Sequence, residues 1–177
     1  MFLLPIGLNN FMKKQFLSLF ISLLFIFSVS AQTKEARKID EFGKIPCGDF
    51  DSRMDGHYQD YKNSLNSKIY VIFYEEQNHL TFTDKREEII KNPRRGNALN
   101  RAKEIPLYLK TIYKMPKDKV VLLNGGFRKD FELEIWIVPK NAELPKSSPT
   151  VDEKDVKFDE GKPIRTRNCA RAYDGYK

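Results

Sequence analysis

The residues of this chain that could do chemistry are two histidines, two cysteines and a scattered set of arginines. His57 and His79 lie 22 residues apart, and no Cys-x-x-Cys or His-x-x-x-His pair occurs that would hold a metal ion. There is no Gly-x-Ser-x-Gly nucleophile motif either, and Gly125-Gly126 lacks the Lys-Ser/Thr partner of a phosphate-binding loop. These patterns predict no enzyme, no metal site and no cofactor.

The N-terminal segment is typical of an export signal. Lys13-Lys14 precedes an apolar run over residues 16–29, and Val29-Ser30-Ala31 supplies the small residues that a signal peptidase reads. We therefore predict a signal peptide over residues 1–31 and a periplasmic or extracellular protein. The apolar run is short for a membrane-spanning helix, which needs about 20 residues, so we expect no membrane span after cleavage. An uncleaved anchor is the alternative.

Cys47 and Cys169 are the two cysteines of the sequence. In an oxidising compartment an even number of cysteines allows a disulfide, which here would tie the C-terminal segment to the start of the domain. A native bridge of this kind contributes about 2–4 kcal/mol. Two unpaired thiols are the alternative, because sequence spacing does not determine whether the two residues approach each other.

The chain of 177 residues is basic, with 31 Lys and Arg against 24 Asp and Glu and a net charge of +7. The densest group of basic side chains comprises Lys85, Arg86, Lys91, Arg94, Arg95, Arg101 and Lys103. Such a group either forms an ordinary solvated face or attracts an anionic partner. Because an exported protein rarely meets nucleic acid, we expect an extracellular anion rather than a nucleic acid: wall polymer, lipid headgroup or acidic protein.

The first half of the predicted domain contains two strands around a helix. A short strand is expected over residues 39–45, and Asp49 is a plausible N-cap for the helix that follows. That helix is indicated by apolar residues at spacings of three and four, namely Phe50, Met54, Tyr58, Tyr61 and Leu65. The β-branched and aromatic run over residues 69–74 predicts a central strand that is buried on both faces.

The second half contains a loop, a helix and two strands. A loop over residues 75–95 is expected to include a short strand at 80–83 and one or two helical turns at 85–91. A long helix begins near Asn97, and Pro106 should kink or restart it. Strands are predicted at 119–123 and 131–138, the second with one solvated face because apolar and polar residues alternate along it.

Between those two strands, residues 124–126 are expected to form a turn. The order β-α-β-α-β-β predicts an α/β fold, more specifically an α+β two-layer sandwich with two long helices on one face of a mixed sheet. We assign this domain to residues 38–139. Residues 32–37 should be a flexible N-terminus, and residues 140–177 a polar linker and tail.

This order and two segments resemble the C-terminal domain of outer-membrane protein A. The segments are residues 97–105, which contain Arg101-Ala102, and residues 115–120, which contain Asp118-Lys119. The resemblance covers about residues 38–139. The chain is also similar to exported bacterial proteins with a Gly-Gly-Phe/Tyr-Arg turn and a Glu-Leu/Ile-Trp-Ile-Val-Pro strand, here residues 125–128 and 134–139.

The resemblance implies peptidoglycan binding, in which an arginine and an aspartate hold the charged ends of a diaminopimelate side chain. Arg101 matches the arginine, and a guanidinium can grip a carboxylate through two parallel hydrogen bonds. The aspartate has two candidate replacements: Glu75, at the end of the strand over residues 69–74, and Asp84. Asn97 would add a supporting polar contact.

We therefore expect an exported, non-catalytic domain similar to that of outer-membrane protein A, which binds peptidoglycan or another anionic envelope component. The alternative is a diverged scaffold that has lost wall binding and acts as a protein-interaction module. Such a module would use the basic surface over residues 85–103 or the face that carries Trp136.

Overall fold

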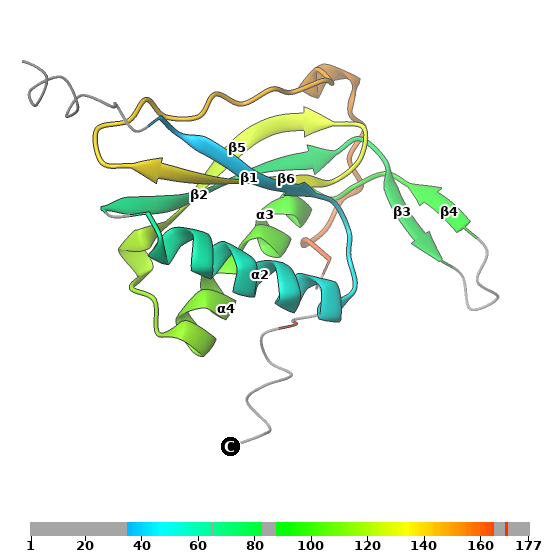
Figure 1. Ribbon diagram of the computed structural model, residues 1–177. Coiled ribbons are helices and arrows are strands. Elements are labelled where there is room, and N and C mark those ends of the chain that lie inside the picture. The colour runs from blue at the N-terminus through cyan, green and yellow to red at the C-terminus, as the bar shows by residue number, and fades with distance from the viewer. Residues whose placement is uncertain (1–34, 65, 83–87, 165–168, 170–177) are drawn as a thin grey trace, which may run out of the picture. The chain divides into compact units, whose positions relative to one another are not determined.

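A mixed four-stranded sheet organises the part of the chain that the computed structural model describes, which is residues 35–64, 66–82, 88–164 and 169 (Figure 1). The predicted signal peptide over residues 1–31 and Asp84 lie outside these residues. Residues 35–177 form one compact unit.

The strands of this sheet lie in the order β1-β6-β2-β5. Their bounds are Arg37–Phe42 for β1, Ser67–Glu76 for β2, Val120–Arg128 for β5 and Glu132–Pro139 for β6. β6 pairs antiparallel with both β1 and β2, whereas β2 and β5 are parallel. The predicted α+β architecture is thus confirmed, and the apolar run over residues 69–74 lies in an interior strand, as expected.

Three helices lie on one face of the sheet: α2 at Cys47–Lys62, α3 at Asn97–Ala102 and α4 at Glu104–Tyr113 (Figure 1). Successive side chains of a strand point to opposite faces of the sheet. The side chains on the face that the helices cover therefore pack against helix side chains in one core. The buried core residues from the helices and from β2 and β6 include Phe50, Met54, Ile105, Leu109, Ile69, Val71, Phe73, Leu133, Ile135 and Ile137.

The starts and breaks of the helices differ from the sequence prediction. α2 begins at Cys47 with Pro46 at its N-cap, so Asp49 lies in the first turn rather than at the cap. The predicted long second helix is divided at Lys103 into α3 and α4. Pro106 is therefore the third residue of α4, where its missing N–H costs no hydrogen bond because the first N–H groups of a helix have no partner within it.

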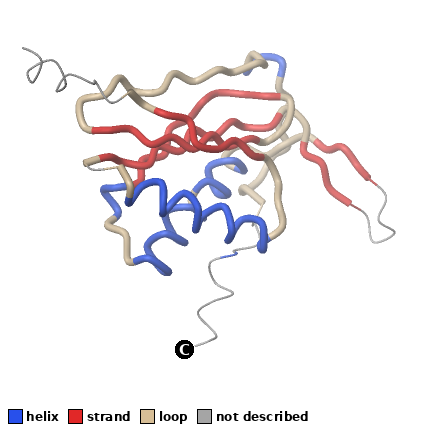
Figure 2. The backbone as a smooth tube through the Cα atoms, viewed as in Figure 1, coloured by secondary structure: helices blue, strands red, loops and turns tan. Residues whose placement is uncertain are grey.

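Residues 88–91, for which helical turns are predicted, form a strand instead. β4 (Glu88–Lys91) pairs antiparallel with β3 (His79–Phe82) in a separate two-stranded sheet. Figure 2 shows this hairpin projecting to one side of the main sheet. The prediction failed because a stretch this short can fit both the spacing of a helix and the alternation of a strand. Pairing with β3 decides in favour of the strand.

The predicted turn at residues 124–126 is also wrong, because β5 continues through it. β5 carries one extra residue relative to β2 between the pairs Phe73↔Asn124 and Glu75↔Phe127, and Gly126 has a φ of +91° at this bulge. Gly125 lies under the Tyr74 ring, where a Cβ atom would stand 2.5 Å from Tyr74 Cε1. Both glycines therefore allow an irregularity within β5, a bulge at Gly126 and a close approach of Tyr74 at Gly125, and do not form a turn that reverses the chain.

The outer face of β6 is less exposed than predicted, because Glu134 is buried while Glu132 and Trp136 are half-buried. After β6 the chain runs as an irregular segment along the side of the sheet away from the helices (Figure 2). Thr150 and Val151 both donate their backbone N–H groups to the carbonyl oxygen of Phe127, at 3.0 and 3.1 Å. Glu134, expected in solvent, is only 2% exposed.

Candidate functional site

The carboxyl end of β2 is the place where charged side chains from several elements converge. Glu75 and Glu76 are both buried there, although carboxylates are rarely buried without partners. Glu75 accepts the backbone N–H of Gly96 at 3.0 Å and that of Ala98 at 3.2 Å, one through each oxygen. It therefore binds the start of α3, and burial raises its pKa even though these two donors oppose the shift.

Glu76 is the centre of an ion-pair cluster. Its Oε2 lies 3.1 Å from Lys44 Nζ and 3.5 Å from Arg101 Nη1, and its Oε1 bonds His79 Nδ1. Burial alone would raise the pKa of Glu76, but the charges of Arg101 and Lys44 and the hydrogen bond with His79 outweigh it. The net pKa lies below its usual range. Glu76 is thus a buried carboxylate that stays ionised because cations surround it.

Arg101 projects from α3 between Glu76 and an aromatic ring. Its guanidinium carbon lies 4.6 Å from the centre of the Phe131 ring, and 16% of its side chain remains exposed. Of the remaining sequence candidates, Asp84 falls outside the described residues and Asn97 has partners of its own. Asn97 is buried, its Oδ1 accepts the N–H of Ile164 at 2.9 Å, and its Nδ2 has no partner among the described residues.

A cavity of about 260 Å³ opens beside this cluster. Its lining residues come from the loop after β1, from the end of β2 and from the connection into β6: Gly43, Lys44, Glu76, Asp130, Phe131 and Glu132. Lys44, 37% exposed, offers an ammonium group at the wall, and the exposed Asp130 offers a carboxylate. The other two carboxylates of the lining are paired within the chain, Glu76 with Lys44 and Arg101 and Glu132 with Arg128. Arg101 does not line the cavity but contacts two of its lining residues, Glu76 and Phe131. A cavity that presents both charges suits a ligand that also carries both.

A second ionic cluster on the outer sheet face was missed by sequence reasoning. Arg128 on β5 lies 2.6 Å from Glu41 and 2.6 Å from Glu134, also pairs with Glu132, and its guanidinium stacks 3.6 Å above the centre of the Tyr74 ring. Burial opposes its charge, but the three carboxylates outweigh burial and raise the pKa of Arg128. No local sequence pattern indicates this cluster, because its charged residues come from three strands, β1, β5 and β6.

The basic residues predicted to form one surface are partly used within the chain. Arg95 pairs with Glu153 at 2.6 Å and stacks 4.0 Å from the centre of the Phe158 ring. Arg94 donates to the carbonyl oxygen of Lys162 at 3.3 Å. Lys85 and Arg86 fall outside the described residues.

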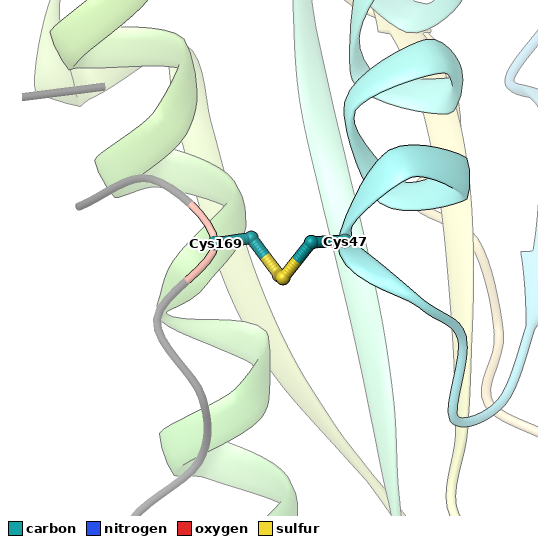
Figure 3. The surroundings of a disulfide bond; sticks show 2 residues. All are labelled: Cys47 and Cys169. Atoms are coloured by element: carbon teal, nitrogen blue, oxygen red, sulfur yellow. A yellow bond between two sulfur atoms is a disulfide. The ribbon is translucent and has the colours of Figure 1, made fainter. Parts of the chain in front are cut away.

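The predicted disulfide between Cys47 and Cys169 is present, with its two Cα atoms 5.3 Å apart (Figure 3). Within the described ranges no three His, Cys, Asp or Glu side chains gather as metal ligands. None of the helices in that part of the chain has the length and apolar character needed to cross a bilayer. Comparison of the chain with family models, curated proteins and solved structures finds no match.

Proposed function

We propose that the chain is an exported, non-catalytic domain, related to the C-terminal domain of outer-membrane protein A, that binds peptidoglycan or another anionic envelope component. The observation that carries the proposal is the cavity of mixed charge at the carboxyl end of β2, beside Arg101. The export signal predicted over residues 1–31 and the resemblance of residues 97–105 support the same function.

The charged groups around the cavity define how such a ligand would bind. Lys44 would hold a carboxylate of the ligand, with Arg101 adding positive charge behind the wall formed by Glu76 and Phe131. Asp130 would receive an ammonium group, since both oxygens of Glu75 already accept backbone N–H groups of α3. A peptide stem of the cell wall carries both kinds of group.

The test is co-sedimentation of the purified protein with insoluble peptidoglycan. Lys44→Ala and Asp130→Asn should each weaken binding about tenfold or more, because each removes one charge-assisted hydrogen bond. Lys110→Ala changes an exposed lysine of α4 that does not line the cavity, so it should bind as the unchanged protein does.

Asp130→Asn is a sharper probe than Lys44→Ala or Arg101→Ala. Lys44 and Arg101 both pair with the buried Glu76, so the loss of either cation also destabilises the fold, and both variants need a check that the domain is folded. Binding that is unchanged in both Lys44→Ala and Asp130→Asn would reject the cavity as the site.

The second candidate is the scaffold that has lost wall binding and contacts another protein. It is favoured by the internal partners of the two residues that the resemblance implicates, because Glu75 binds the start of α3 and Arg101 pairs with Glu76. A folded protein that does not sediment with peptidoglycan would support it. The partner surface would then be sought away from Arg94 and Arg95, which contact residues 153–162 of the same chain.

A further inference from the structure

The chain after residue 147 passes around one end of the sheet, from its outer face to the start of α3. We call residues 148–164 the belt. It begins on the outer sheet face, where the Ser148 N–H donates to Tyr74 Oη at 3.0 Å and Val151 forms an isolated antiparallel bridge with Phe127. The sequence indicated only a polar linker and tail here, whereas these contacts give the segment a defined path.

The belt then passes around the end of the sheet to the start of α3. Phe158 packs between the ring of Phe127, at a centroid distance of 5.9 Å, and the guanidinium of Arg95. Farther on, Asp159 donates its N–H to the carbonyl oxygen of Pro93 at 2.9 Å, and Ile164 donates to Asn97. Cys169 then joins the start of α2 through the disulfide (Figure 3).

Little apolar surface holds the belt in place. Val156 is its one buried hydrophobic residue beyond position 149, and the short helix at Glu153–Asp155 buries none of its residues. Its side-chain hydrogen bonds with Gln77, Asn92, Arg94 and Arg95 are exposed, whereas those of Ser148 and Ile164 are part-buried. Exposed ion pairs such as Arg95–Glu153 stabilise weakly. The disulfide adds a covalent restraint to these contacts, and it closes a separation of 122 residues.

The disulfide and the belt contact two segments close to the candidate site. Cys47 directly follows the loop over residues 43–46, which brings Gly43 and Lys44 to the cavity. The belt contacts Asn97 in α3, four residues before Arg101, which does not line the cavity but pairs with its lining residue Glu76. Reduction would remove the covalent restraint beside the Lys44 loop, and release of the belt would remove the contact of Ile164 with α3.

We propose that the Cys47–Cys169 disulfide is a redox-controlled clasp: reduction by a dithiol releases the belt and thereby weakens ligand binding at the cavity. The effect on binding rests on the proposed function, whereas release of the belt does not. A thiolate of the dithiol attacks Sγ of the half-buried Cys47 and expels the Cys169 thiolate. The second thiol of the reductant then displaces Cys47. The protein gains two electrons and two protons, and the dithiol becomes a disulfide.

The test compares hydrogen exchange of the oxidised protein with that of the protein reduced by dithiothreitol. Backbone amides of residues 150–164 should exchange at least about tenfold faster after reduction, while amides of β2 keep their protection. The double variant Cys47→Ser/Cys169→Ser, without reductant, should match the reduced protein. Equal belt exchange in both states, or loss of protection throughout β2, would overturn the clasp.

Co-sedimentation with insoluble peptidoglycan separates this proposal from the proposed function. Binding that weakens several-fold in the reduced protein and in the double variant supports the coupling. Belt release with unchanged binding would overturn the coupling. Absence of binding in the oxidised protein would instead reject the proposed function, and with it the coupling, while the exchange data still decide whether the clasp exists.

Discussion

Gly125 is the position where the packing of the sheet allows the sharpest prediction. In Gly125→Ala the new Cβ atom would stand 2.5 Å from Tyr74 Cε1, 2.7 Å from Tyr74 Cδ1 and 2.7 Å from Ile72 Cγ2. Carbon atoms in contact prefer about 3.5–4.0 Å, so the overlap is close to an ångström at each. Such overlap must be relieved by moving β5, the Tyr74 ring, or both.

The Tyr74 ring has little freedom to move. Arg128 stacks over it at 3.6 Å, and its hydroxyl accepts the N–H of Ser148 at 3.0 Å. Overpacking of a filled interior costs about 1–3 kcal/mol, and we expect Gly125→Ala at the upper end, near 3 kcal/mol. For a domain of this size, that loss lowers the melting temperature by about 6–12 °C.

Gly56→Ala is the matched control. Gly56 lies inside α2, and a Cβ atom added there would have no neighbour within 4 Å. Alanine is the better helix former, so this variant should gain about 0.5–1 kcal/mol. The same substitution should therefore change the free energy of unfolding in opposite directions at the two sites.

The assay is equilibrium unfolding in urea, followed by the fluorescence of Trp136, the single tryptophan of the chain, and by circular dichroism. A Gly125→Ala variant as stable as the unchanged protein would refute the reasoning. It would mean that Tyr74 does not pack on Gly125 as closely as these distances require.

Three further predictions concern buried charge. Ile72→Asp should abolish cooperative unfolding, because Ile72 is 1% exposed in β2 and a carboxylate there has no partner; a cooperative melt would show that β2 is not central. Arg128→Met should cost about 3–5 kcal/mol by leaving the buried Glu134 without its main partner, and Arg128→Met/Glu134→Gln should recover part of this loss in the same urea assay. In the folded protein burial lowers the pKa of His57 despite its hydrogen bond with Asp40. In the unfolded chain the pKa of His57 is about 6.5. Below that pH the unfolded state binds more protons, so the free energy of unfolding should fall from pH 7.5 to 5.5. His57→Leu should show a smaller fall, and an equal fall in both proteins would contradict this assignment.

The candidate site shows why long-range charge pairing escapes sequence reasoning. Arg101 drew attention through a local motif, and its role as a ligand residue stays a prediction. Its contacts with Glu76 and Phe131, and the approach of Lys44 from the loop after β1, join segments that are far apart in the chain. A side-chain pair of this kind leaves no periodic trace, so sequence spacing could not distinguish Glu76, which binds cations, from Glu75, which holds α3.

What the sequence determined by itself is the order of the four strands of the main sheet with a helical region after each of the first two, and the position of the central strand. These features depend on hydrophobic periods that are local: the run over residues 69–74 reads as a buried strand wherever it is placed. The possibility of a disulfide also followed from composition, but its formation required Cys47 and Cys169 to approach within 5.3 Å.

Only the tertiary structure decided the rest. Residues 88–91 became a strand because β3 offers a partner, and residues 124–126 stayed in β5, where Tyr74 covers Gly125. Glu134 became buried beside Arg128 of β5, with which it pairs. In each case the local preference is weak or satisfied equally by two conformations. The free energy that chooses between them comes from burial and pairing with residues distant in sequence, which exist only once the chain has folded.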